Sequence, residues 1–228
     1  EIDYIIQKDY LPESIPFKGR SFPYILNITT GCPWNKLIRK SLIDEYQLQF
    51  MPLHRSNDVY FIFMALALAE KITVVQEVFV NYRQSGSSLQ ANNVKSPWDW
   101  YEALKALKLK FEELQIYEEL RSSFRNLAFG VGIYNLCSLK SGEAFCKVYE
   151  RMKQEFFEEF DLTDFKEEEC YSYNSKKYEI YRNMMQCTAG EYLFLEVQKL
   201  KQEKSYWAAR AKNAEKENKN KNPKERLS

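Results

Sequence analysis

The sequence has almost no net charge, a single histidine and no long apolar run, and each absence excludes a class of protein. Lys and Arg number 33 against 32 Asp and Glu, so the formal charge of +1 gives no overall attraction to nucleic acid. No stretch approaches the roughly 18 consecutive apolar residues of a membrane-spanning helix. His54 has no partner in the sequence pattern and is expected to be exposed. With 45% hydrophobic and 29% charged residues in 228, the composition is that of an ordinary globular protein.

The cysteines are also too sparsely placed to form a recognisable site. There are five of them, an odd number, and none of their spacings matches the CxxC or CxxxC pairs of zinc sites: Cys32, Cys137, Cys146, Cys170 and Cys187. This pattern is typical of reduced thiols in a cytosolic protein.

Charge is unevenly distributed between the last 30 residues and the rest. From Lys199 to Ser228 there are ten Lys or Arg and four Asp or Glu, whereas the remainder is mildly acidic. A basic tail on an acidic body suggests that the tail has a partner of its own. The chain opens with Glu1 rather than Met, which fits either a removed leader or a piece of a longer protein.

The first 95 residues have the pattern of an α/β region. β-branched and aromatic runs predict short strands at 22–29, 36–38, 72–75 and 78–83, with a loop at 85–88. Residues 41–46 suggest one or two helical turns. A longer helix is expected after Asn57, and it is too apolar to lie on a surface, so we expect it to pack against the sheet.

From Ser96 onward the apolar residues recur at helical spacing. Ser96-Pro97 suggests a helix start, and three stripes follow. They consist of Leu104, Leu107, Phe111 and Leu114; Leu120, Phe124, Leu127, Val131 and Tyr134; and Phe145, Val148, Met152 and Phe156. A fourth helix is expected at 178–185.

A last helix is predicted to begin at a capping box, Thr188 to Glu191. Its apolar positions alternate by four and three residues, close to a coiled-coil seam with a lysine in one core position. The members of this seam are Leu193, Val197, Leu200, Lys204, Trp207, Ala211 and Ala214. From Glu215 onward we expect a frayed or disordered end.

Asp58, in the run Ser56-Asn57-Asp58-Val59-Tyr60-Phe61, has two interpretations. Asp, Asn and Ser side chains cap helix N-termini, because their oxygens accept from backbone N–H groups that lack a partner. A carboxylate at such a position can also serve as a general base. The two roles are compatible, since the N–H dipoles would keep the carboxylate ionised.

Several pieces, taken in order, favour the second interpretation. Pro33-Trp34-Asn35-Lys36-Leu37-Ile38-Arg39, then Phe50, then Asn57 to Phe61, then Tyr82-Arg83 resemble the acceptor-side half of family 2 glycosyltransferases of the GT-A fold. The closest likeness is to bacterial enzymes that build surface polysaccharides, and it covers about residues 22–92. In that family a Glu-Asp pair opens the helix under the acceptor. Here the pair is Asn57-Asp58, so only the base matches.

The resemblance implies a set of roles. Asp58 would be the catalytic base of an inverting transfer, and Arg83 would pair with phosphate oxygens of the leaving nucleoside diphosphate. The other substrate-binding candidates are Trp34, Lys36, Asn57, Ser87 and Ser88. For Trp34 a buried anchor of the turn, and for Arg83 a surface position at a strand end, are the competing interpretations.

The implied donor is a nucleotide-sugar, bound with Mn or Mg at an Asp-x-Asp element in an N-terminal half. No Asp-x-Asp precedes Phe22, and about 20 residues cannot hold a βαβ unit of about 30. The metal ligands are thus expected outside this chain, and the chain is expected to be an acceptor-side fragment, inactive by itself.

Together these observations predict a partial GT-A α/β fold with a short mixed sheet at 1–95, a helical subdomain at 96–187, and an amphipathic helix with a basic tail at 188–228. The expected partners are a saccharide or lipid-linked acceptor and no nucleic acid. Residues 188–214 would make weak contact with a membrane surface or with a second copy. The expected place is the cytoplasm, at the inner face of the membrane if the tail docks there. The alternative function is a non-catalytic helical module for assembly, descended from such an enzyme.

Overall fold

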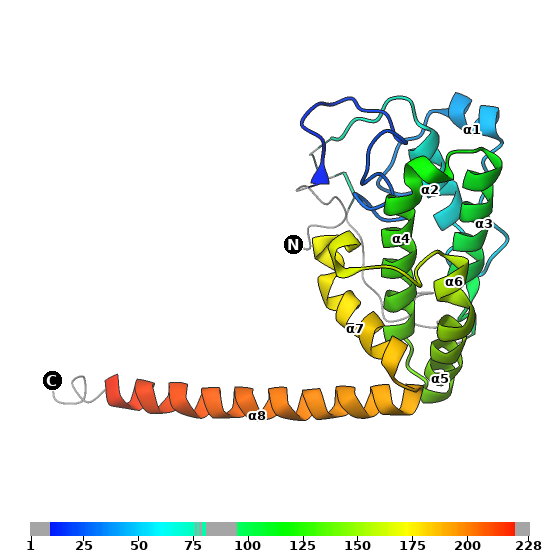
Figure 1. Cartoon of the computed structure of the whole chain (residues 1–228). Coiled ribbons are helices and arrows are strands. Elements are labelled where there is room, and N and C mark those ends of the chain that lie inside the picture. The colour runs from blue at the N-terminus through cyan, green and yellow to red at the C-terminus, as the bar shows by residue number, and fades with distance from the viewer. Residues whose placement is uncertain (1–9, 76, 78, 81–94, 222–228) are drawn as a thin grey trace. The chain divides into compact units, whose positions relative to one another are not determined.

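The computed structural model describes residues 10–75, 77, 79–80 and 95–221, and these form a mostly helical protein (Figure 1). No strand occurs in these ranges, although Phe17 and Ile72 form an isolated antiparallel bridge. The predicted α/β fold with a mixed sheet is therefore wrong, and the described chain is all-α. It divides into two compact units, residues 1–182 and residues 183–228.

The helices follow one another with short connections. In order they are α1 (Lys40–Tyr46), α2 (Val59–Leu68), α3 (Asp99–Glu113), α4 (Tyr117–Cys137), α5 (Gly142–Arg151), a π-helical turn (Met152–Phe156), α6 (Phe157–Glu159), two 3₁₀ turns (Glu167–Glu169 and Ser172–Asn174), α7 (Ser175–Gln186) and α8 (Ala189–Lys221). Helical residues run without a break from α5 through the π turn to α6, and this continuous segment is called the α5–α6 rod.

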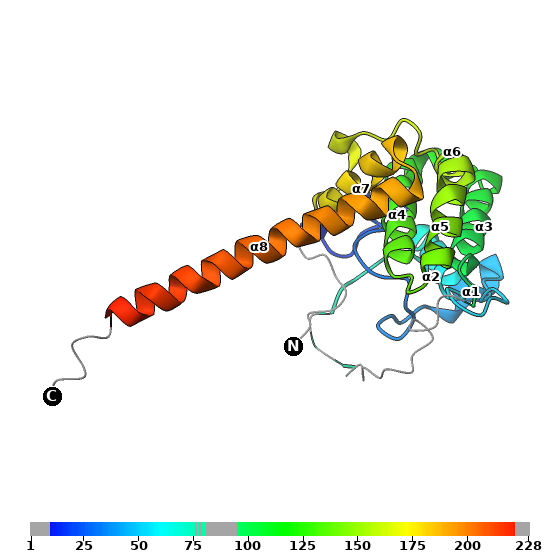
Figure 2. The same ribbon diagram turned by 90° about the horizontal axis from the view of Figure 1, so that it is seen from below.

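The core of the first unit lies where α2, α3, α4 and the α5–α6 rod meet. α3 packs against both α2 and α4, and α4 packs against α5, as both Figure 1 and Figure 2 show. Aromatic rings fill the centre: Trp100 and Phe160 each lie against Phe156, with ring centroids 5.4 and 4.9 Å apart. Edge-to-face pairs of this kind add to the stabilisation from buried apolar area.

Buried polar residues of α4 tie irregular segments to this core. The Ser123 hydroxyl accepts from the Leu26 backbone N–H at 3.0 Å and donates to the Asn27 side-chain oxygen at 2.7 Å. The Asn126 amide donates to the Glu169 carbonyl at 2.9 Å and accepts from the Tyr171 N–H at 2.8 Å. Buried backbone groups need such partners, so α4 fixes two loops without a sheet.

This arrangement explains why the predicted strand at 22–29 is wrong. Ile25, Leu26 and Ile28 are buried, as their apolar character requires, but the backbone folds into successive turns such as Asn27 N–H to Tyr24 carbonyl at 2.8 Å. Side chains of α4 replace the partner strand that the run would otherwise need. Residues 36–38 and 72–75 are likewise not strands, and 78 and 81–83 lie outside the described residues, as does the predicted loop at 85–88.

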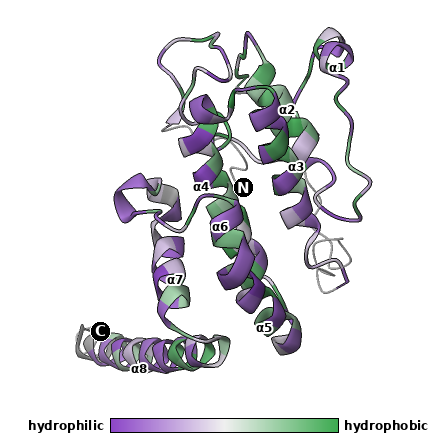
Figure 3. Cartoon of the chain, turned by 45° about the vertical axis from the view of Figure 1, so that its right-hand side comes forward, coloured by the Kyte–Doolittle hydropathy of each residue, from purple (hydrophilic) through white to green (hydrophobic). Residues whose placement is uncertain are grey.

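The helical predictions hold much better. α1 covers the predicted 41–46, α2 begins just after Asn57, and α7 contains the predicted helix at 178–185. Figure 3 shows the hydrophobic colouring of α2, whose residues from Phe61 to Leu68 are nearly all buried. The three predicted stripes are buried except at their edges, where Leu114 and Val131 are half-buried and Tyr134 is 53% exposed. α3 starts at Asp99, later than Ser96-Pro97 suggested: the Trp98 carbonyl accepts the first backbone bonds of the helix, and the Pro97 carbonyl accepts from the Trp100 indole at 2.6 Å instead.

The second unit consists of the end of α7 and the long helix α8. The predicted capping box is confirmed: the Thr188 hydroxyl accepts from the Glu191 N–H at 3.3 Å, and the Glu191 carboxylate accepts from the Thr188 N–H at 2.8 Å. α8 continues through Glu215 to Lys221, so the predicted fraying at Glu215 is wrong, while 222–228 lie outside the described residues. None of the described helices is both long enough and apolar enough to cross a membrane.

Gly132 lets α4 approach the π turn closely. A Cβ at this position would lie 2.5 Å from the ring tip of Phe156 and 3.1 Å from the terminal carbon of Met152, and both side chains are fully buried. We expect Gly132→Ala to lower the free energy of unfolding by about 1–3 kcal/mol, because the packed ring cannot move away. Urea denaturation measures the change.

The matched control is Gly142→Ala in the first turn of α5, where a Cβ would meet nothing within 4 Å. That variant should be neutral or gain up to about 1 kcal/mol from helix propensity. Equal stability of the two variants would contradict the close approach at Gly132.

Candidate functional site

The site around Asp58 is built by the turn that enters α2. The Met51 N–H donates to the Asn57 carbonyl at 3.0 Å, and Ser56 takes a left-handed conformation with φ of 54°. Arg55 is buried, and its backbone N–H donates to the Asp99 carboxylate at 2.8 Å, which anchors the turn to the start of α3. The turn therefore fixes Asp58 as the residue before the first residue of α2.

Asp58 occupies the cap position without capping through its side chain. Its carboxylate makes no cap hydrogen bond, whereas its backbone carbonyl accepts from the Ile62 N–H at 2.9 Å. The side chain thus lacks a cap hydrogen bond, although the N–H groups of Asp58 and Val59 favour its ionised form.

Lys36 is held by the loop that precedes it. Its ammonium donates to the carbonyls of Thr30 and Cys32, each at 2.8 Å, and to the Asn35 side-chain oxygen at 2.7 Å. Gly31 seats this loop on α2, since a Cβ there would lie 3.3 Å from the Phe63 ring. Residues 30–36, an irregular segment, thus curl around one ammonium group at the start of α2.

Lys36 and Asp58, 22 positions apart in sequence, interact electrostatically. Burial lowers the pKa of Lys36 to about 8, and the nearby Cys32 and Asp58 act in the opposite direction. Burial raises the pKa of Asp58 above its usual range, although the N–H groups of Asp58 and Val59 and the Lys36 ammonium favour its ionised form. Desolvation thus outweighs the helix N–H dipoles that were expected to dominate. Both groups are tuned toward neutral pH, as acid–base sites often are.

Exposed aromatic and apolar side chains lie in the segments that form the site. Trp34 belongs to the same loop as Lys36 and is 38% exposed, so the competing prediction of a buried anchor is wrong. Phe50 is 49% exposed and stacks on Phe61 in the first turn of α2, with ring centroids 4.5 Å apart. Exposed flat rings of this kind offer surfaces on which a sugar ring can stack.

The structure brings only some of the predicted residues together. Asn57 is exposed beside Asp58, while Arg83, Ser87 and Ser88 lie outside the described residues. His54 is exposed, as predicted. The five cysteines, all of them described, form no disulfide. No three His, Cys, Asp or Glu side chains of the described ranges gather as a metal site requires, so these residues do not fit the Mn or Mg that the resemblance implies.

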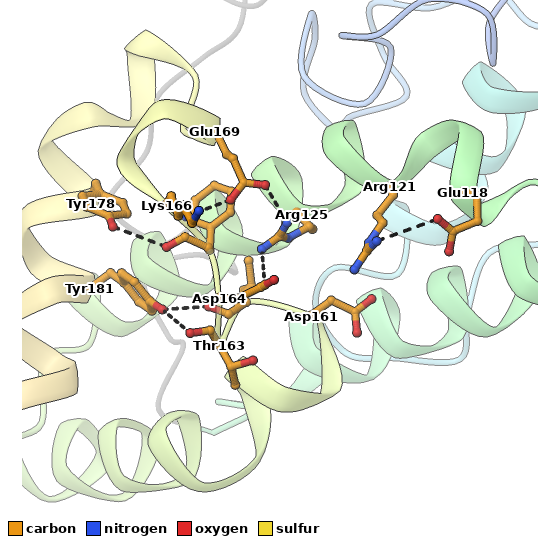
Figure 4. Close-up of polar contacts among 12 residues, drawn as sticks. Glu118, Arg121, Arg125, Asp161, Thr163, Asp164, Lys166, Glu169, Tyr178 and Tyr181 are labelled. Atoms are coloured by element: carbon orange, nitrogen blue, oxygen red, sulfur yellow. Dashed lines mark hydrogen bonds and ion pairs between the residues drawn. The ribbon is translucent and has the colours of Figure 1, made fainter.

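A second polar cluster, centred on Arg125 of α4, was not predicted from the sequence (Figure 4). Its guanidinium donates to Asp164 at 2.6 Å and to Glu169 at 2.7 Å, and it lies over the Phe165 ring at 5.1 Å. Arg125 is only 6% exposed, whereas the Asp164 side chain is 72% exposed. The arginine is thus used to hold the loop 162–169 on α4. The available signal was that Arg125 is the only charged residue in the mostly apolar stretch 124–133.

Comparisons with known proteins add no assignment. The chain matches no protein-family model, no curated protein and no solved structure.

The lowered pKa of Lys36 predicts a pH dependence of stability. Between pH 8 and 10.5 the unfolded chain binds more protons at this lysine than the folded chain, so the free energy of unfolding rises with pH through that window. We expect the free energy of unfolding of the wild type, minus that of Lys36→Met, to rise by on the order of 2 kcal/mol across this pH window. Urea denaturation at several pH values measures this change, and Lys40→Met is the control for loss of an exposed lysine. A stability difference between wild type and Lys36→Met that does not vary with pH would contradict the lowered pKa of Lys36.

Proposed function

We propose that the chain supplies the acceptor side of an inverting glycosyl transfer from a nucleotide-sugar to a saccharide or lipid-linked hydroxyl, with Asp58 as general base. The observation that carries the proposal is the electrostatic interaction of Lys36 with Asp58 at the start of α2, where the carboxylate is half-buried, its pKa is raised, and its side chain makes no cap hydrogen bond. These two residues come from separate pieces of the family resemblance. The GT-A sheet forms no part of the proposal.

The proposed reaction needs few groups at this site besides a base. As the acceptor oxygen attacks the anomeric carbon, its proton passes to the Asp58 carboxylate, and the bond from that carbon to the diphosphate oxygen breaks on the opposite face. A carboxylate with a raised pKa is the stronger base for this transfer. Lys36 acts as a positioning residue, because its charge favours the ionised form of Asp58 and its hydrogen bonds hold the loop that carries Trp34. The phosphate contact of Arg83 stays a prediction.

The test is a transfer assay on the protein in its full natural length, because the proposed reaction requires donor-binding residues besides Asp58, Lys36 and Trp34. UDP- and GDP-sugars are supplied with Mn²⁺ and a lipid-linked or oligosaccharide acceptor, and NMR determines the anomeric configuration of the product. Product with inverted configuration is expected. Product with retained configuration, or a folded protein that transfers no sugar, would contradict the proposal.

A second candidate function is a non-catalytic module for assembly. The observation that favours it is the all-α architecture together with the 33-residue helix α8, whose residues from Lys199 to Lys216 are all exposed. A folded protein without transfer activity that still self-associates would favour this second function.

A further inference from the structure

One face of α8 presents apolar side chains to solvent. Leu193, Val197, Leu200 and Trp207 are between 38% and 62% exposed. Most of the stability of helices in proteins comes from packing of such a face. Phe194, Leu195 and Tyr206 of α8 are exposed as well but lie off this face. The rest of the helix is largely hydrophilic, as Figure 3 shows, so the four residues of the stripe are the exposed apolar set that follows heptad spacing.

The stripe has the register of a two-stranded coiled coil. Written as heptads, Val197, Lys204 and Ala211 take the a positions, and the d positions are Leu193, Leu200, Trp207 and Ala214. Val at a with Leu at d favours parallel dimers, and one lysine at a fixes register and oligomer size at some cost in stability. Three heptads are near the lower limit for such pairing.

The charged residues beside the stripe indicate which helix binds it. In a parallel pair each g residue faces the e residue five positions later on the other helix. Glu196 would therefore face Lys201 of a second copy, and Arg210 would face Glu215. Both pairs are of opposite sign, and each occurs twice in a symmetric dimer. The remaining g residue, Glu203, would face Ala208, which is neutral.

We propose that α8 binds α8 of a second copy of this chain as a parallel coiled coil along Leu193–Ala214. In the single chain Arg210 lies 5.4 Å from the Trp207 ring centre and 3.4 Å from the Tyr206 hydroxyl, so pairing redirects it to the second copy's Glu215. The seam buries Leu200 and Trp207, the exposed apolar side chains nearest its centre. This proposal does not depend on transferase activity.

Sedimentation equilibrium of the 228-residue chain tests the proposal through paired charge reversals. Glu196→Lys alone sets lysine against lysine, and Lys201→Glu alone sets glutamate against glutamate. Each change should raise the dimer dissociation constant roughly tenfold. An equimolar mixture of the two variants should associate as well as wild type, because every g–e contact is again of opposite sign. An antiparallel pair does not predict this recovery.

The matched control is Lys212→Glu, which makes the same charge change at an exposed b position outside the seam. It should dimerise like wild type, and circular dichroism should show equal helicity in all variants. Three results would overturn the proposal: a wild-type chain that stays monomeric up to about 200 μM, equal weakening by Lys201→Glu and Lys212→Glu, or a monomer that binds vesicles of anionic lipid through α8 instead.

Discussion

Asp58→Asn is expected to lower kcat/KM for glycosyl transfer by about 10²–10⁴ fold while leaving the protein folded. The amide keeps the size of the side chain and removes the base. Stability should stay level or rise slightly, because burial raises the pKa of Asp58 and the ionised group therefore costs folding free energy at neutral pH. If Asp58 were mainly a helix cap, Asp58→Asn would keep both stability and activity, because Asn caps as well as Asp, and a loss of about 1 kcal/mol would appear only in Asp58→Ala.

The pH profile and a surface control sharpen this test. Transfer by the wild type should fall as the pH drops through the raised pKa of Asp58, since only the carboxylate accepts a proton. Asp44→Asn removes an equivalent charge from α1, where Asp44 is paired with Lys40 at 2.6 Å and exposed, and should leave kcat/KM unchanged. Transfer that survives Asp58→Asn at full rate would rule out the base. The assay uses the protein in its full natural length.

The sequence predicted which residues are buried better than it predicted backbone conformation. Leu104, Phe124 and Val148 are buried as their helical spacing requires, because an amphipathic helix can bury only one stripe. Ile25 and Leu26 are buried too, but as turns rather than a strand. A strand depends on a partner, and here the Ser123 hydroxyl, far away in sequence, accepts from the Leu26 N–H instead and donates to the Asn27 side chain. A hydrogen-bond partner that comes from so far away in the sequence leaves no local pattern.

Two of the predicted site residues interact in the structure, but their electrostatics could not be predicted from the sequence, and Arg83, Ser87 and Ser88 lie outside the described residues. Family resemblance pointed to both Lys36 and Asp58, and the structure places them in interaction. Their pKa shifts depend on desolvation by the loop 30–36 and by α2, which spacing alone cannot measure. Arg125 was missed for a related reason, because its carboxylate partners, Asp164 and Glu169, are some 40 residues away.

Arg125→Ala is expected to lower the free energy of unfolding by about 3 kcal/mol, since it removes two charge-assisted hydrogen bonds and the packing on Phe165. Arg125→Met should lose less, because it keeps the packing and leaves two carboxylates that solvent can reach. The matched control is Arg121→Ala, one turn earlier on α4, where the guanidinium is 44% exposed and lies 3.9 Å from an exposed Glu118 (Figure 4). That change should cost less than about 0.5 kcal/mol. Urea denaturation compares the three variants; equal losses at 121 and 125 would show that the buried arginine does not hold the 162–169 loop on α4.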